Sequence, residues 1–268
     1  MMKPSRTAWS ALAALTLITP VVLGFASSSA APGKSVVYDA LGDSYASGYG
    51  VPPYQACGRS QAAYAVQLDG RMKIDLDGFA ACAGATTASL VSGGQLTALD
   101  EDTELVTITI GGNDIAWSSA VFACLGGSDE QCAGALAVTR GKVTADLPGL
   151  LDSVYTQVSA AARSAHVVVT GYPRLFSPEY GPYLAASATE QEALNEGADL
   201  LNAVIAEAAA GHGFQFVDIT KRFVGHGVNA TEPWILGPFD PGAFHPDADG
   251  YEAYTAAVTA AINPSRLG

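Results

Sequence analysis

Five short strand-like segments recur along the chain, four of them largely apolar and one, 71–76, with a weaker apolar pattern, and polar or helix-like segments separate them. These segments are residues 35–41, 71–76, 105–110, 166–170 and 214–219, and the third is the clearest strand signal. Runs that are apolar throughout, rather than alternating, are typical of strands buried on both faces. We therefore predict an α/β fold with a mostly parallel sheet of five strands, covered by helices on both sides.

Helical patterns lie between these strands, and we predict helices over residues 62–68, 142–165, 188–210 and 249–262. Pro148 starts the regular part of the second helix, and Ser187 with Glu190 forms a capping-box pattern that opens the third. The cysteines and the Gly/Pro-rich stretches fall in the predicted loops. Because the sequence has no internal repeat or low-complexity linker, we predict a single domain over residues 31–268.

The first thirty residues are typical of an export signal. Lys3 and Arg6 give a basic start, residues 11–25 are apolar, and small residues end at Ala30. The alternative is a membrane anchor, but this apolar run is short of the roughly 20 residues that a spanning helix needs, and Pro20 interrupts it. We expect a signal peptide over residues 1–30, its removal near Ala30, and a secreted protein without a stable membrane anchor.

The chain is acidic, and its four cysteines follow the predicted signal. Two of the 13 lysines and arginines lie in that signal, so its removal changes the net charge from −13 to −15. Such a surface repels nucleic acid and anionic membranes. An even cysteine count in an exported chain favours two disulfides over free thiols or a zinc site. Three pairings are possible, and we expect neighbours to pair, Cys57 with Cys82 and Cys124 with Cys132.

The candidate nucleophile is Ser44, which follows the first predicted strand in Gly-Asp-Ser-Tyr at 42–45. Ligands bind at the carboxyl ends of parallel strands, and Gly42 permits a tight turn that would expose the serine hydroxyl and amide. The alternative is a serine that only caps the following helix. The Gly-x-Ser-x-Gly elbow of α/β-hydrolases does not occur in the sequence, which argues against that family.

Asn113 is the candidate oxyanion donor, because it follows the third predicted strand through Gly111 and Gly112. Removing one such donor typically costs about 2.7–4 kcal/mol of barrier. The alternative is an asparagine that only makes a turn. Gly84 is a weaker candidate for a second donor through its amide, and a disulfide at Cys82 would hold its loop in place.

A serine nucleophile needs a base, because its hydroxyl alone reacts poorly. His245 is the first candidate, since Pro246 restricts the backbone beside it. His226, in a loop between two glycines, is the main rival. His166 opens a strand and His212 ends a helix, so both are better explained as structural residues.

With these motifs in order, the chain resembles the SGNH (GDSL) hydrolases, and most closely their secreted actinomycete esterase/lipase branch. The resemblance covers residues 38–262 and rests on Gly-Asp-Ser-Tyr at 42–45, Ala-Cys-Ala-Gly at 81–84, Ile-Thr-Ile-Gly-Gly-Asn-Asp at 108–114 and Phe-His-Pro at 244–246. It implies a flavodoxin-like three-layer α/β/α sandwich. It also implies Ser44 as nucleophile, His245 as base, and an oxyanion hole formed by the Ser44 amide, Gly84 and Asn113.

One position departs from the family pattern. An aspartate often stands three residues before the catalytic histidine, where this chain has Gly242. The imidazole of His245 still needs an acceptor on its second nitrogen, and similar secreted relatives use a backbone carbonyl. We therefore expect a Ser–His dyad oriented by the carbonyl of Gly242 or Ala243, with Asp240 and the more remote Asp247 as carboxylate alternatives.

Other polar and aromatic residues near these motifs have two interpretations. Asp43 and Asp114 are expected to hold their loops through backbone hydrogen bonds rather than to act on substrate. Four aromatic residues are candidates to line an acyl groove, although aromatics near a sheet are more often core: Tyr45, Trp117, Phe223 and Trp234.

The sequence thus predicts a secreted serine hydrolase of carboxylic esters, acting on acyl lipids or other acyl esters. Deacetylation of polysaccharide on the same fold is the alternative enzymatic function. A non-catalytic lipid- or sugar-binding module is disfavoured, because Ser44, Asn113 and His245 are all present. No metal or cofactor is implied, the expected partner is a small-molecule or lipid ester, and a monomer is expected.

Overall fold

The structure, a computed structural model, describes residues 1–2 and 34–262, and in that part of the chain five strands form one parallel sheet. The strands are β1 (Val36–Gly42), β2 (Ile74–Phe79), β3 (Leu105–Thr109), β4 (His166–Thr170) and β5 (Gln215–Val217). Their order, β2-β1-β3-β4-β5, is that of flavodoxin-like sheets. The predicted fold class is confirmed, with every strand pair parallel.

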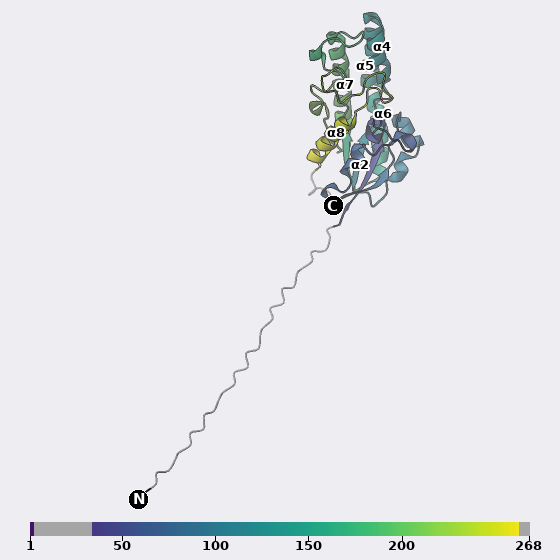
Figure 1. Ribbon diagram of the computed structural model, residues 1–268. Coiled ribbons are helices and arrows are strands. Elements are labelled where there is room, and N and C mark those ends of the chain that lie inside the picture. The colour runs from purple at the N-terminus through teal and green to yellow at the C-terminus, as the bar shows by residue number, and fades with distance from the viewer. Residues whose placement is uncertain (3–33, 263–268) are drawn as a thin grey trace. The chain divides into compact units, whose positions relative to one another are not determined.

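Helices cover both faces of this sheet. In the described residues they are α1 (Ser44–Ser47), α2 (Tyr64–Leu68), α3 (Thr87–Ser92), α4 (Trp117–Gly126), α5 (Asp129–Ala145), α6 (Leu147–Ala161), α7 (Ala188–Gly211) and α8 (Ala248–Ala261). Helices α2 and α8 pack on one face, and α3, α6 and α7 on the other. Figure 1 shows α4 and α5 beside α7.

The central strand β3 shows why the sheet is buried on both sides. Val106 and Ile108 pack into the core under α6 and α7. The alternate residues, Thr107 and Thr109, face the side of the sheet that α2 and α8 cover. There the Thr107 hydroxyl hydrogen-bonds the Tyr38 hydroxyl at 2.6 Å, and the Thr109 hydroxyl hydrogen-bonds the Tyr64 hydroxyl at 3.0 Å. These pairs satisfy polar groups that would otherwise be costly to bury.

The parallel register gathers the functional loops at one edge of the sheet. Gly42, the last residue of β1, pairs with Thr109, the last residue of β3. A side chain on Gly42, whose φ is +131°, would collide with the Thr109 carbonyl. The close approach of these two neighbouring strand ends therefore requires glycine at this position.

Some predicted boundaries are wrong. The second strand is Ile74–Phe79 rather than 71–76, because Arg71–Lys73 forms a 3₁₀ turn with Met72 and Lys73 in the left-handed region. This strand lies at an edge of the sheet, where its exposed acidic residues are tolerated and weaken the apolar signal. The fifth strand is also shorter than predicted, at Gln215–Val217.

The helices between β3 and β4 differ most from the prediction. The helical stretch over 142–165 is two helices, α5 and α6, with Asp146 between them and Pro148 in the first turn of α6. Helix α4 and most of α5 were predicted as loops. Ser128 and Gln131 form a capping box that opens α5, so a sequence signal for this helix does exist.

Two disulfides pair the four cysteines as predicted. Cys57 bonds Cys82, which ties the turn after α1 to the loop after β2. Cys124 bonds Cys132, which joins α4 to α5.

The predicted export signal and its cleavage near Ala30 lie outside the described residues. Within the residues that the structure describes, every helix is too short or too polar to cross a bilayer.

Candidate active site

Ser44 is the first residue of α1, directly after β1. Asp43, not Ser44, is the N-cap of this short helix, and its carboxylate accepts a hydrogen bond of 2.9 Å from the Tyr45 amide. Gly48, in the left-handed region, ends the helix after one turn. Ser44 therefore has a fixed backbone and a side chain that lines a pocket.

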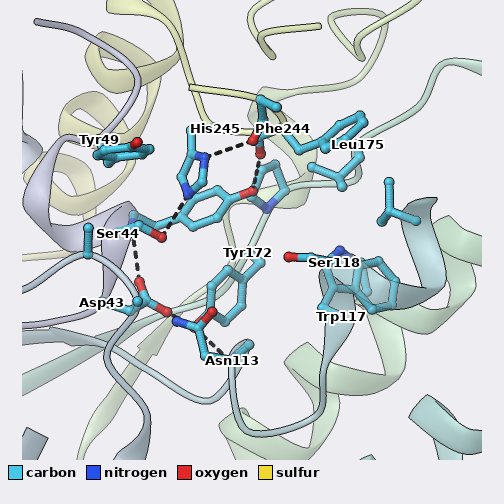
Figure 2. Close-up of a pocket in the computed structure, with 18 of the residues that line it drawn as sticks. Asp43, Ser44, Tyr49, Asn113, Trp117, Ser118, Tyr172, Leu175, Phe244 and His245 are labelled. Atoms are coloured by element: carbon cyan, nitrogen blue, oxygen red, sulfur yellow. Dashed lines mark hydrogen bonds between the residues drawn. The ribbon is translucent and has the colours of Figure 1, made fainter. Parts of the chain in front are cut away.

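His245 faces Ser44 from the loop before α8. Its Nε2 lies 2.7 Å from Ser44 Oγ, as Figure 2 shows. Its Nδ1 lies 2.9 Å from the Ala243 carbonyl and 3.3 Å from that of Gly242. Because a carbonyl only accepts, Nδ1 carries the proton and Nε2 is free to accept the serine proton.

The environment of His245 favours the neutral imidazole. Burial lowers its pKa from the usual 6.5, and the hydrogen bonds to the Ala243 and Gly242 carbonyls oppose this effect only in part. A neutral imidazole with a free Nε2 lone pair is the form that can act as a general base near neutral pH.

Three residues that line the pocket have an N–H group free to bind a ligand. Asn113 Nδ2 donates to the Ala85 carbonyl at 2.9 Å, which fixes the amide and leaves its second N–H for a ligand. In the described part of the chain, the amides of Ser44 and Gly84 donate to no protein oxygen. All three residues line the same pocket, so the predicted oxyanion-hole residues are brought together.

The loop that carries Gly84 is held on both sides. Its neighbours make the hydrogen bonds Ala83 N to Cys57 O at 2.8 Å and Ala85 N to Cys82 O at 3.0 Å. Gly84 itself has φ +80°, a left-handed conformation that favours glycine. The disulfide beside it therefore belongs to the support of the candidate oxyanion hole.

The two aspartates beside the motif residues have structural partners, as predicted. The Asp114 carboxylate accepts hydrogen bonds from the hydroxyl of Thr87, at 2.7 Å, and from the backbone amide of Thr87, at 3.1 Å, at the start of α3. Asp43 is buried and accepts from the Tyr172 hydroxyl at 2.5 Å as well as from the Tyr45 amide. Burial raises the pKa of Asp43 to about 7, although these hydrogen bonds act in the opposite direction.

The carboxylate alternatives for orienting His245 have other partners. Asp240 Oδ2 accepts from the Gly237 amide at 2.8 Å. Asp247 is the N-cap of α8 and accepts from the Gly250 amide at 2.9 Å. Backbone carbonyls alone contact Nδ1 of His245 in the described residues.

The rival histidines lie outside the pocket. His226 stacks on Trp234, with ring centroids 3.5 Å apart, and its Nδ1 contacts the Glu232 carbonyl. His166 pairs with Gln215, and His212 with Asp152.

An apolar groove extends from Ser44 between α4 and α7. The cavity has a volume of about 360 Å³. Its walls are mainly apolar, formed by Trp117, Val121, Leu175, Ala198, Leu201 and Phe244. Of the predicted lining aromatics, Tyr45 and Trp117 do line it, whereas Phe223 is buried in the core and Trp234 stacks on His226. Phe223 therefore has the core role that is the more common one for aromatics near a sheet, and Trp234 lies outside the groove.

Comparison with known protein families identifies the family to which the chain with these site residues belongs. The model of the GDSL-like Lipase/Acylhydrolase family matches residues 40–253, which include every site residue described above. The chain belongs to this family. Lipase 1 of Streptomyces coelicolor is 38% identical over 249 residues, which cover 89% of this chain and 92% of that protein.

Two solved structures of Streptomyces enzymes share the fold and about a third of the sequence. The extracellular lipase from Streptomyces rimosus superposes with a TM-score of 0.80 at 34% identity, and phospholipase A1 from Streptomyces albidoflavus NA297 with 0.78 at 36%. Each match covers 85% of this chain and 100% of the other. Like these relatives, the chain is a carboxylic ester hydrolase.

Two tyrosines in the pocket of this GDSL-family site were not among the sequence candidates. Tyr49 packs edge-on against the His245 ring at a centroid distance of 5.1 Å. Tyr172 follows β4 and contacts Asp43. Tyr172 stands in Gly-Tyr-Pro at 171–173, a local pattern that carries no information on which group the hydroxyl would contact.

Proposed function

We propose that the enzyme hydrolyses esters through a Ser44–His245 dyad without a carboxylate partner. The observation that carries this proposal is the chain of contacts from Ser44 Oγ to His245 Nε2 at 2.7 Å and from His245 Nδ1 to the Ala243 carbonyl at 2.9 Å. The carbonyl fixes the tautomer, which is the main role of the aspartate in a Ser-His-Asp triad.

In the proposed reaction, Ser44 Oγ attacks the ester carbonyl carbon while its proton passes to His245 Nε2. The carbonyl oxygen becomes an oxyanion, which accepts from the Ser44 and Gly84 amides and from Asn113 Nδ2. The tetrahedral intermediate then collapses, and the alcohol leaves with the proton from His245. Water attacks the acyl-enzyme by the same steps and releases the carboxylic acid.

We propose that the acyl chain of a lipid ester occupies the groove between α4 and α7. Ser44 lines the same cavity as the apolar residues Leu201 and Trp117, so a hydrocarbon chain bound there would be removed from water. The names of the relatives, lipase and phospholipase A1, support acyl lipids as the substrate class.

Deacetylation of polysaccharide is the second candidate. An acetyl group would fill only a small part of the cavity of about 360 Å³ and leave most of its apolar walls without contact. The volume of the groove therefore favours longer acyl chains.

We also propose that residues 1–30 direct export and are removed near Ala30, so that the mature enzyme comprises residues 31–268 and is secreted. The extracellular relative from Streptomyces rimosus supports this location. The proposed chemistry needs no metal or cofactor, because the dyad and the N–H donors supply it. The site residues all come from one chain, which supports a monomer as the working form.

The substrate class is tested with p-nitrophenyl esters from acetate to palmitate, beside acetylated xylan and phosphatidylcholine vesicles. The proposal expects kcat/KM to rise with acyl length and the phospholipid to be cleaved. Efficient release of acetate from xylan, with acetate as the best p-nitrophenyl ester, would favour the second candidate.

A further inference from the structure

We propose that Tyr172 is a positioning residue that holds the Ser44 turn and the Asn113 loop at the distance the reaction requires. The inference rests on the proposed dyad and oxyanion hole.

The Tyr172 hydroxyl bridges two loops that follow different strands. It donates to Asp43 Oδ2 at 2.5 Å and accepts from the Gly112 amide at 3.0 Å. Asp43 immediately precedes Ser44, and Gly112 immediately precedes Asn113. One hydroxyl therefore joins the residue before the nucleophile to the residue before the oxyanion donor.

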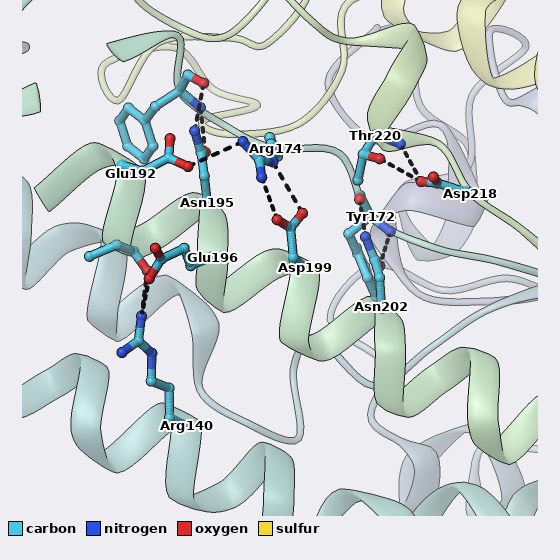
Figure 3. Close-up of polar contacts among 12 residues, drawn as sticks. Arg140, Tyr172, Arg174, Glu192, Asn195, Glu196, Asp199, Asn202, Asp218 and Thr220 are labelled. Carbon is cyan, nitrogen blue, oxygen red and sulfur yellow. Dashed lines mark hydrogen bonds and ion pairs between the residues drawn. The ribbon is translucent and has the colours of Figure 1, made fainter. Parts of the chain in front are cut away.

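The backbone of Tyr172 is fixed independently of its side chain. Asn202 on α7 accepts from the Tyr172 amide and donates to the Tyr172 carbonyl, both at 2.8 Å. Figure 3 shows this paired contact. Arg174, two residues on, donates to Asp199 of the same helix. Because α7 holds this segment through the main chain, the loss of the hydroxyl would leave the ring in place.

The ring of Tyr172 extends the support to the third loop of the site. It meets the Tyr45 ring edge-on, with centroids 5.1 Å apart. The Tyr45 hydroxyl in turn donates to the Phe244 carbonyl at 2.5 Å, next to His245. Phe244 has a left-handed φ of +62°, so this bond holds a backbone conformation that is unfavourable for phenylalanine.

The hydroxyl also favours the ionised form of Asp43, so its loss is expected to appear in the pH profile. The Tyr172 hydrogen bond lowers the pKa of Asp43, which burial and the neighbouring Asp114 raise. The pKa of Tyr172 is itself well above 10, so the hydroxyl stays a donor across the working range. The other titratable groups around the carboxylate are His245, across Ser44, and the hydroxyls of Tyr45, Tyr64, Tyr251 and Tyr254.

The test is Tyr172→Phe, which removes the hydroxyl and keeps the ring. We expect kcat to fall about 10- to 100-fold, since small misplacements of reacting groups have effects of this size, and KM for a p-nitrophenyl ester to change little. The acid limb of kcat/KM should move to higher pH, because the Asp43 carboxylate that holds the Ser44 turn loses a donor and is protonated more readily.

Tyr155→Phe is the matched control. The Tyr155 hydroxyl is buried but has no hydrogen-bond partner in the described residues, and it lies outside the pocket. Its removal should leave kcat and the pH profile unchanged, so a general effect of deleting a buried hydroxyl is separated from the effect at Tyr172.

Gly112→Ala tests the same contact from the other side, should Tyr172→Phe fail to fold. A Cβ on Gly112 would lie 3.1 Å from Tyr172 Cζ and 3.3 Å from its hydroxyl oxygen, which displaces the ring slightly. We expect a smaller decrease of kcat and a pH shift in the same direction.

A folded Tyr172→Phe with wild-type kcat and an unshifted acid limb would overturn the inference, as would a folded Gly112→Ala without effect. Ser44→Ala separates this failure from that of the proposed function. If Ser44→Ala retains esterase activity, the proposed function is refuted. If Ser44→Ala is inactive and Tyr172→Phe is fully active, only the role of Tyr172 is refuted.

Discussion

Gly242 packs against Gly50 so closely that a Cβ on Gly242 would lie 2.5 Å from the Gly50 Cα. The same atom would lie 2.8 Å from Leu236 Cδ1. The position at which the family often has an aspartate therefore has no room for any side chain in this enzyme. The nearby carbonyl of Ala243 takes the contact with His245 Nδ1 instead.

The first prediction concerns the carboxylate nearest to this loop. Asp240→Ala should lower kcat by less than about 10-fold, because Asp240 bonds the Gly237 amide and not the imidazole. Steady-state kinetics on one ester, with Ser44→Ala as the inactive reference, measures this. A loss beyond about 10³-fold, toward the 10⁴-fold loss seen for triad aspartates, would contradict the dyad.

The second prediction separates strain from catalysis at Gly84. Gly84 and Gly70 have φ of +80° and +73°, and a Cβ on either would meet nothing within 4 Å. Alanine at each should cost about 1–2 kcal/mol of stability through left-handed strain. Only Gly84→Ala should also lower kcat, by about 10-fold or more, because it moves an oxyanion donor.

Urea unfolding and ester kinetics on both variants provide the comparison. An equal loss of stability with unchanged kcat in both would remove Gly84 from the oxyanion hole.

The third prediction is the pH dependence of stability that Asp43 imposes. Its folded pKa of about 7 lies above the reference value of 3.8, so the folded state binds this proton more tightly than the unfolded state. Stability from this group is therefore fully present at low pH and decreases as pH rises from about 4 to about 7, by up to about 1.4 kcal/mol per unit.

Asp43→Asn should abolish this contribution, whereas Ser44→Ala, which keeps the carboxylate, should retain it. The free energy of unfolding in urea, measured at several pH values in this window, gives the slope for each variant. Identical slopes in Asp43→Asn and the wild type would show that Asp43 titrates normally.

The fourth prediction addresses the acyl groove. Trp117 packs against α7 at Gly197, where an added Cβ would lie 2.9 Å from its ring, and forms one wall of the groove. Trp117→Ala should lower the ratio of kcat/KM for palmitate over butyrate esters by about 10-fold, since long chains lose an apolar wall. Trp234→Ala, outside the groove, should leave this ratio unchanged, and equal effects of the two would refute the assignment.

The sequence was sufficient for those features that local residues determine. The apolar run that became β3 and the capping box at Ser187 specify their elements through neighbouring residues alone. The Gly-Asp-Ser and Phe-His-Pro motifs were identified because a reactive side chain stands beside turn residues in each. The order of these motifs indicated the family, which added the flavodoxin-like arrangement to the α/β fold that the apolar runs predict.

Features that depend on distant contacts were missed or misplaced. Helices α4 and α5 have weak amphipathic patterns, because one packs over the groove and both pack on other helices rather than on the sheet. The bridge from Tyr172 to Asp43 joins residues 129 positions apart. The contact between Gly50 and Gly242, which leaves no space for an aspartate, is likewise set by tertiary packing alone.

The central claim is that Ser44 is the nucleophile activated by His245. Incubation with a p-nitrophenyl alkylphosphonate, followed by peptide mass spectrometry, tests it most directly. We predict one phosphonyl group per enzyme on Ser44 and a loss of activity in proportion to labelling. Ser44→Ala should not be labelled, and His245→Ala should be labelled at a greatly reduced rate. Full inactivation with Ser44 unmodified, or full activity with Ser44 modified, would contradict the account.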